Sequence, residues 1–481
     1  ARRAAPLIGT ILLAACSVGP QYQRPAAPDV SAYTRESLGH LAGDNGQQLV
    51  SGQNPAQDWW MLFHSEQLDA IMRQALAGNR TLTAAKATLA QAREVVNASA
   101  GALYPQVSLD GGAGRQKYGA EFGGNDVPPP YTYFAIGPSV SYLLDYTGGN
   151  SRAVEQQQAQ ADYAACQLQA AYLSLTGNVA QQALSIASTR AQIEALQALL
   201  AEDEKNLSLV QTAFAAGSVT RVDVLSAQSQ FANDQTLLPP LRQQLSVAQH
   251  ALSVLAGQAP ANWTPPDFAL SSFQLPQSLP LSLPSELAHR RPDILAAEAQ
   301  LHAATAAVGV ATSRLYPQIT LTASASQQST SLSNLFDASS TAWGLVGGLT
   351  APLFDGGTLR AQRRGAEDAM HAAAANYQHV VLQAFGQVAD VLTALDQDSA
   401  LLSAQKNALD SAHDNLTLAR ESYRYGNTGV LSVLDAERLF QQAELGYVRA
   451  QARRYQDTAQ LLLALGGGTS LEPEKTETES R

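Results

Sequence analysis

The sequence is poor in charge, in aromatic side chains and in cysteine. Of its 481 residues, 15% are charged, 6% are aromatic and two are cysteines. The eight histidines form no His-Glu-x-x-His pattern, no Cys-x-x-Cys pair is present, and no phosphate-cradling glycine loop precedes a helix. We therefore expect no enzyme active site, no metal site and no bound cofactor. Cys166 lies in an Ala- and Gln-rich helical stretch, where we expect a small packing role.

Basic residues are also scarce. Lys and Arg number 30 against 41 Asp and Glu, which gives a net charge of −11. Binding to nucleic-acid phosphates needs a clustered basic face. The charge balance therefore predicts that nucleic acid is not a partner, and it fits either an acidic lumen or an ordinary soluble surface.

Long hydrophobic runs are missing as well. No stretch after residue 16 reaches 18 apolar residues, so we expect no transmembrane helix in the mature chain. A membrane crossing by this chain would then have to be made of β-strands.

The first 15 residues have the layout of a secretion signal. Arg2 and Arg3 precede an apolar stretch, Pro6–Ala15, which is too short to cross a membrane as a helix. The sequence LAAC that ends at Cys16 resembles the bacterial lipobox, in which the cysteine becomes the acylated first residue of the mature protein. Ser17 stands where lipoproteins of the inner membrane carry Asp, so the resemblance implies outer-membrane sorting and a covalent lipid on Cys16. We expect the initiator methionine slightly upstream.

The rest of the chain is a tandem duplication. Residues 79–109 laid on 291–321 match identically at 11 of 31 positions, including the repeated motif LYPQ. The segments GSVTRVDVLSAQSQF from Gly217 and GNTGVLSVLDAERLF from Gly426 share 5 of 15 residues. The two halves are therefore expected to fold alike.

Each half predicts a helix, a β-hairpin and a very long helical hairpin, in that order. Period-two alternation begins after Tyr104-Pro105 and after Tyr316-Pro317, because proline stops a helix and favours extended backbone before it. We interpret these four residues as helix-to-barrel junctions, with the tyrosines suited either to the membrane boundary or to simple packing. Helical spacing then runs without proline from 150 to 216, which at 1.5 Å per residue is about 100 Å of helix.

The pattern divides the chain into six segments. Single helices are expected at 64–101 and 284–314, and Pro239-Pro240 marks a kink or break in a helix at 220–256. The segments are a signal peptide (1–15), a lipid-anchored extended or equatorial segment (16–63), a first repeat (64–257) with a β-hairpin at 104–146 and a helical hairpin at 150–256, a proline-rich equatorial linker (258–284), a second repeat (285–465) with a β-hairpin at 316–354 and a helical hairpin at 357–465, and a disordered tail (466–481).

Four strands per chain leave a closure problem, because open sheet edges are not tolerated in lipid. Two copies would give eight strands with a filled interior, whereas three would give twelve strands and a lumen. A pore therefore favours a homotrimer, with the long Ala-rich helices packed around a tube. An extended coiled-coil rod without a channel is the alternative.

Several stretches resemble the TolC-like outer-membrane efflux factors, specifically their NodT-type lipoprotein branch. They are CSVGPQYQRP, LLPPLRQQLSVAQHALSVLAGQAP, HRRPDILAAEAQLHAATAAVGVATSRLYPQITL and YRYGNTGVLSVLDAERLF, and together they cover nearly the whole mature chain. The resemblance implies an α+β membrane protein: a homotrimer with a twelve-stranded outer-membrane β-barrel, a periplasmic α-barrel and an equatorial domain. It also implies a periplasmic adaptor protein and an inner-membrane RND-type pump as partners.

The helix turns are the places where the resemblance assigns roles to residues. It implies that the turns meet the adaptor, although reversal of the chain alone would justify their glycines. Asp435 and Arg438, three apart on one helical face, match the family's closed periplasmic gate, and a surface ion pair is the alternative interpretation. Asp223 lies in the corresponding region of the first half, where helix capping explains it equally well. The residues expected at the adaptor-contacting tips are Gly217, Ser218, Val219, Gly426, Asn427 and Thr428.

Three functions are consistent with this pattern. The first is an outer-membrane channel of a tripartite efflux pump, a passive gated conduit for small molecules such as drugs. The second is the outer-membrane exit duct of a type I protein secretion system. The third is a lipid-anchored structural rod without a lumen, and the tandem strands count against it.

Overall fold

The computed structural model describes residues 18–26, 28, 30–35, 47–118 and 129–468. The chain divides into two compact units. The first takes in the N-terminal residues up to 25 and the segments 88–165 and 296–378. The second takes in 26–87, 166–295 and the chain from 379 onward.

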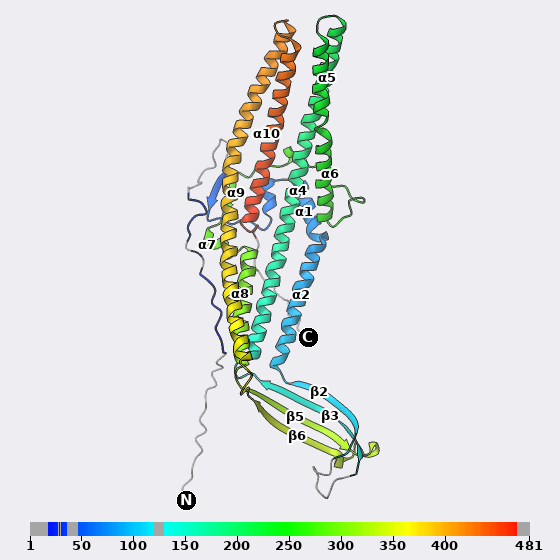
Figure 1. Ribbon diagram of the computed structural model, residues 1–481, viewed down its shortest axis with the longest axis vertical. Coiled ribbons are helices and arrows are strands. Elements are labelled where there is room, and N and C mark those ends of the chain that lie inside the picture. Colours follow the sequence, from blue (N-terminus) through cyan, green and yellow to red (C-terminus); the bar gives the residue numbers. More distant parts are fainter. Residues whose placement is uncertain (1–17, 27, 29, 36–46, 119–128, 469–481) are drawn as a thin grey trace. The chain divides into compact units, whose positions relative to one another are not determined.

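A four-stranded antiparallel sheet dominates the first unit (Figure 1). Its strand order is β2-β3-β5-β6, so each half of the chain contributes one hairpin and the two hairpins meet between β3 and β5. The strands are β2 (Gln106–Gln116), β3 (Tyr131–Leu144), β5 (Gln318–Ser329) and β6 (Thr341–Thr350). The register of β3 on β5 is interrupted between Ile136 and Ser139, where Pro138 has no N–H to donate.

Four helices directly precede or follow the strands of this sheet along the chain, and each lies at least partly in the first unit. They are α2 (Arg80–Ala100), α8 (Pro292–Ser313) and the N-terminal parts of the two longest helices, α4 (Gly149–Ala215) and α9 (Thr358–Arg424). The N-terminal segment lies on α8, because Tyr22 stacks on His302 and its hydroxyl donates to Glu298 at 3.0 Å. Among the described residues α8 is long and apolar enough to cross a membrane, but 61% of its apolar window is buried.

Two helical hairpins run side by side in the second unit (Figure 1). The first pairs α4 with α5 (Arg221–Gln235) and α6 (Leu238–Leu255), and the second pairs α9 with α10 (Val430–Ala464). A small cluster of valines and leucines from α4, α5 and α10 joins the two hairpins close to their turns. The 67-residue lengths of α4 and α9 follow from proline-free, Ala-rich sequence.

The main core of the second unit gathers around a short 3-10 helix, Trp59–Phe63. Trp59 and Phe63 are fully buried and pack with α1 (Glu66–Gly78), α4, α6 and α10. Beside this core lies a two-stranded parallel sheet of β1 (Gln48–Ser51) and β4 (Ser278–Leu281). A single turn, α7 (Pro284–Leu287), precedes α8.

Two helices expected to be continuous are interrupted, and a third is broken where a kink or break was expected. The helix expected at 64–101 breaks at Asn79, whose side chain accepts from the N–H of Leu82 and donates to the carbonyl of Leu255, so it caps α2 and ties it to α6. The helix expected at 284–314 breaks before Pro292, and the buried Arg291 at this break binds Asp293 and the carbonyl of Ala464. The third interruption separates α5 from α6, next to the proline pair that predicted a break there.

The first three residues of the tail expected at 466–481 are described by the structure, and two of them are buried. Gly466 and Gly467 are buried, and Gly467 approaches Trp59 and Leu173 closely. Residues 469–481 lie outside the described part of the chain.

Candidate functional site

The sheet of the first unit has two chemically different faces. One row across all four strands reads Val107, Val140, Ala323, Leu345, and every member is apolar. The next row reads Ser108, Ser139, Ser324, Gly344, and its members are small or polar. Because neighbouring rows point to opposite faces, one face is apolar and the other is polar.

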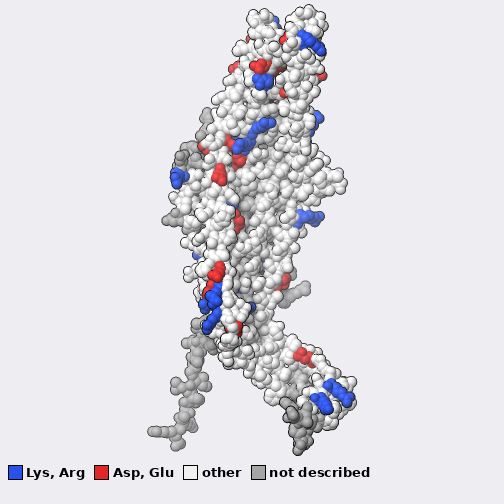
Figure 2. Space-filling model, in the orientation of Figure 1, with Lys and Arg blue, Asp and Glu red and all other residues white. Residues whose placement is uncertain are grey.

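The apolar face is exposed within this chain. Trp343, Leu345 and Leu349 on β6 are 81%, 76% and 69% exposed. Charged atoms are few on the side of the sheet seen in Figure 2. Apolar residues facing out and polar residues facing in are the alternation that a β-sheet in a lipid bilayer requires.

The sheet has two free edges among the described residues, β2 and β6, each paired on one side only. Free N–H and C=O groups along an edge must find partners if the sheet lies in lipid. In lipid, this sheet would therefore need further strands at both edges.

Both predicted junctions lie directly before a strand. Tyr104 is exposed and extended at the end of the 3-10 turn Gly101–Leu103, and Pro105 leads into β2. Tyr316 and Pro317 lead into β5 in the same way, and the carbonyl of Pro317 accepts a hydrogen bond from Tyr146. The proline stops that the sequence predicts are thus found at the helix-to-strand transitions, and the role of the tyrosines stays a prediction.

The two hairpin turns are nearly identical in geometry. Gly217 and Gly426 both have a φ of +77°, which favours glycine. Ser218 N–H donates to the carbonyl of Ala213, and Asn427 N–H donates to that of Ser422, both at 2.9 Å. Of the other predicted tip residues, Val219 packs on the apolar cluster beneath the turns, and Thr428 is exposed.

The predicted gate pair forms an ion pair on α10. Arg438 Nη2 lies 2.8 Å from Asp435 Oδ1, and both side chains are well exposed. An exposed pair of this kind stabilises a helix by less than about 1 kcal/mol. In the first hairpin, by contrast, Asp223 accepts from the N–H and the hydroxyl of Thr220 at 2.7 Å, so it caps α5.

Sequence reasoning missed a group of buried acids near these turns. Asp203, Asp234 and Glu437 are all less than a tenth exposed, and Glu437 is the neighbour of Arg438. The stretch AEDEK around Asp203 reads as a solvated charge run, so only its packing against α5 and α10 reveals the burial.

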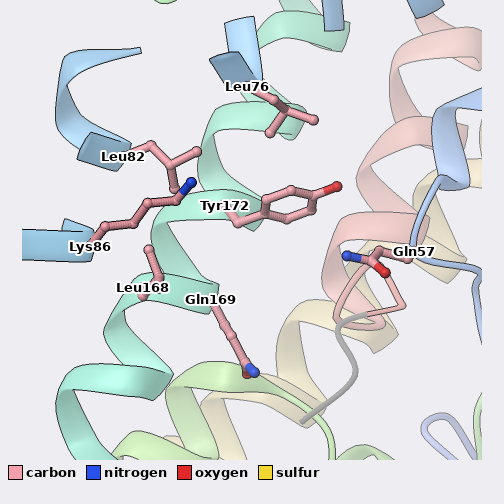
Figure 3. Close-up of a pocket in the computed structure, with 7 residues that line it drawn as sticks. All are labelled: Gln57, Leu76, Leu82, Lys86, Leu168, Gln169 and Tyr172. Carbon is pink, nitrogen blue, oxygen red and sulfur yellow. The ribbon is translucent and has the colours of Figure 1, made fainter. Parts of the chain in front are cut away.

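No group of metal-ligating side chains occurs in the part of the chain that the structure describes. A cavity of about 250 Å³ lies between α1, α2 and α4 and is lined by leucines, Tyr172 and the amine of Lys86 (Figure 3). Its described lining includes no cysteine, serine, histidine or carboxylate. The expected lipid site, Cys16, lies outside the described residues.

Comparison with known proteins identifies the class. The sequence model of the family described as "Outer membrane efflux protein" matches residues 71–258 and 283–467, one match in each half of the repeat. The chain therefore belongs to the outer membrane efflux protein family, a family of outer-membrane channels and not of enzymes.

Particular relatives resemble it over nearly their whole length. The chain is 31% identical to the pyoverdine export outer membrane protein OpmQ of Pseudomonas aeruginosa, covering 89% of this chain and 92% of OpmQ. It is 30% identical to the probable outer membrane lipoprotein SilC of Salmonella typhimurium, covering 96% and 98%. The solved structure of the outer-membrane channel OprN matches with a TM-score of 0.86 at 27% identity, covering 94% of this chain and 99% of that chain. The TolC-like α+β fold and the efflux-channel function that the sequence predicts are thereby confirmed.

Proposed function

We propose that three copies of this chain form the outer-membrane exit channel of a tripartite efflux pump and export small molecules. The observation that carries this proposal is the two-faced sheet with two free edges. Joining β6 of one copy to β2 of the next closes twelve strands with the apolar face toward lipid and the polar face toward a lumen. The homotrimer satisfies both edges at once.

The helical hairpins continue this channel as a periplasmic α-barrel, and the linker 258–284 contributes to an equatorial domain. A lipid on Cys16 anchors each copy to the outer membrane. Gly217, Ser218, Val219, Gly426, Asn427 and Thr428 meet a periplasmic adaptor protein, through which the channel connects to an inner-membrane RND-type pump. Support comes from the paired turns of equal geometry and from relatives that are export proteins.

Asp435 and Arg438 act at the periplasmic gate. Three-fold symmetry repeats Asp435 around the narrow end of the α-barrel, where a carboxylate ring attracts cations and its pairing with Arg438 holds the constriction closed. We expect Asp435→Ala combined with Arg438→Ala to raise single-channel conductance in planar bilayers. The matched control is Lys406→Ala combined with Asp410→Ala, which removes another exposed ion pair and should leave conductance unchanged. Equal conductance of the wild type and the Asp435/Arg438 variant contradicts the gate assignment.

The lumen is tested by thiol labelling of two neighbouring positions on β5. We expect Ser324→Cys, on the polar face, to react in intact cells with a small charged thiol reagent. Ala323→Cys, on the apolar face, should stay unlabelled because lipid covers it. Equal labelling of both positions, or labelling of Ala323→Cys alone, contradicts the barrel.

A further inference from the structure

Three carboxyl groups are buried where α4, α5 and α10 meet. The exposed fractions of these residues are 5% for Asp203 on α4, 7% for Asp234 on α5 and 3% for Glu437 on α10. An ionised carboxylate in such a place is costly unless a cation or a set of hydrogen bonds compensates its charge.

Glu437 has this compensation. Its Oε1 lies 2.8 Å from Nη2 of Arg420 on α9, and its Oε2 accepts from the side-chain amide of Asn206. The surrounding cations are engaged as well, because Arg420 also lies 3.5 Å from Glu202, and Glu202 binds Lys205 at 2.8 Å. The positive charges of Arg420 and Lys205 are therefore already balanced by the negative charges of Glu437 and Glu202.

The aspartate pair has no cation of its own among these groups. Asp203 and Asp234 are both buried between α4 and α5, and the nearby Asp234 carboxyl helps to raise the pKa of Asp203. Asp234 also accepts from Gln230 at 2.7 Å. Within the described part of the chain the second oxygen of Asp203, Oδ2, is buried and has no hydrogen-bond partner. Two carboxyl groups can hydrogen-bond to each other only when a proton lies between them. Asp203 and Asp234 can therefore hydrogen-bond to each other only when the pair holds one proton.

We propose that Asp203 and Asp234 form a proton-binding site that fastens α4 to α5 beneath the periplasmic tip, and that losing the proton loosens this tip and its gate. The site lies 14 residues before Gly217, about 20 Å along α4. Glu437, which faces the site, stands between Asp435 and Arg438 in sequence, so a shift of α10 reaches the gate pair directly. The effect on the gate rests on the proposed function, whereas the binding of the proton does not.

The direction of the effect follows from the surroundings of the site. Burial, the hydrogen bond to Asp234 and the charge of Glu437 raise the pKa of Asp203 to about 7, from 3.8. Contact between α4 and α5 is therefore strongest in acid, weakens as the pH rises from the ordinary aspartate range, and is weakest above about 7.

Hydrogen exchange of α5 in the full-length, detergent-purified protein tests the site at about pH 6 and pH 8. After correction for intrinsic exchange, the protection of 221–235 in the wild type should fall at least several-fold at the higher pH. Asp203→Asn, which keeps the shape and a donor without a charge, should remove this fall. The control Glu204→Gln neutralises the exposed neighbour and should behave as the wild type. The second hairpin holds another carboxyl pair, Asp398 with Asp457, so protection must be measured at α5 itself.

Two results overturn the proton site: a wild-type α5 whose protection is the same at both pH values, or an Asp203→Asn variant that still loses protection at the higher pH. Conductance in planar bilayers tests the effect on the gate. At the higher pH the wild type should conduct more than Asp203→Asn, and equal conductance overturns this part. Absence of conductance at either pH counts against the channel function, while hydrogen exchange still decides whether the proton site exists.

Discussion

Gly257 provides a quantitative test of how the second unit is packed. It follows α6 with a φ of +74°, and a Cβ added there would collide with the carbonyl group of Gly78 at the end of α1. An alanine in left-handed backbone costs about 1–2 kcal/mol. Forcing a methyl group into a filled space costs about 1–3 kcal/mol more. We therefore expect Gly257→Ala to destabilise the protein by about 2–5 kcal/mol.

Gly217 is the matched control for this variant. Its φ of +77° is nearly the same, but no atom lies within 4 Å of an added Cβ. Gly217→Ala should therefore lose only the backbone part, about 1–2 kcal/mol. Urea unfolding of the purified protein in detergent, followed by far-ultraviolet circular dichroism, measures both variants. Equal losses would refute the close approach between α1 and α6, and no loss in either variant would refute the left-handed turns.

Three further predictions concern single side chains. Asn79→Ala removes the cap of α2 and the bond to Leu255, so urea unfolding should show a loss of about 1–3 kcal/mol, which Asn79→Asp should recover only in part; equal stability of all three proteins contradicts this. Arg454→Met leaves the buried partners Gln47 and Ser399 without their donor, so the same assay should show a loss of about 1–3 kcal/mol per group, and full stability of the variant contradicts it. The hydrogen bonds from Thr220 lower the pKa of Asp223, so its contribution to the free energy of unfolding is present above the ordinary aspartate pKa and is lost as the pH falls through the lowered value. Asp223→Asn should therefore make the free energy of unfolding depend less on pH at the acid end. An unchanged dependence on pH there contradicts the cap.

Much of the fold can be predicted because its signals are local and long. The period-two rows and the 67-residue proline-free helices repeat their pattern many times, so the α+β class and the tandem layout follow from sequence. The break at Asn79 could not be predicted, because the group that its side chain binds lies 176 residues away, at Leu255. Helical spacing continues on both sides of Asn79, and only the tertiary contact selects the break.

Some features of the candidate site could likewise be predicted from the sequence, and others could not. The left-handed turns at Gly217 and Gly426 are visible as glycines between helical stretches. The burial of Asp203 is invisible, because an acid in a charge run becomes a buried acid only when α5 and α10 cover it. The roles of the tips and of the pair Asp435–Arg438 stay predictions, since they depend on other chains.

The most direct test of the central claim is the electrical behaviour of the purified full-length protein in planar lipid bilayers. A trimeric channel with a polar lumen predicts discrete, uniform conductance steps that appear without any other protein. It also predicts larger steps when Asp435 and Arg438 are both replaced by alanine. A protein that inserts in its native, folded state and yet gives no conductance in either form contradicts the channel.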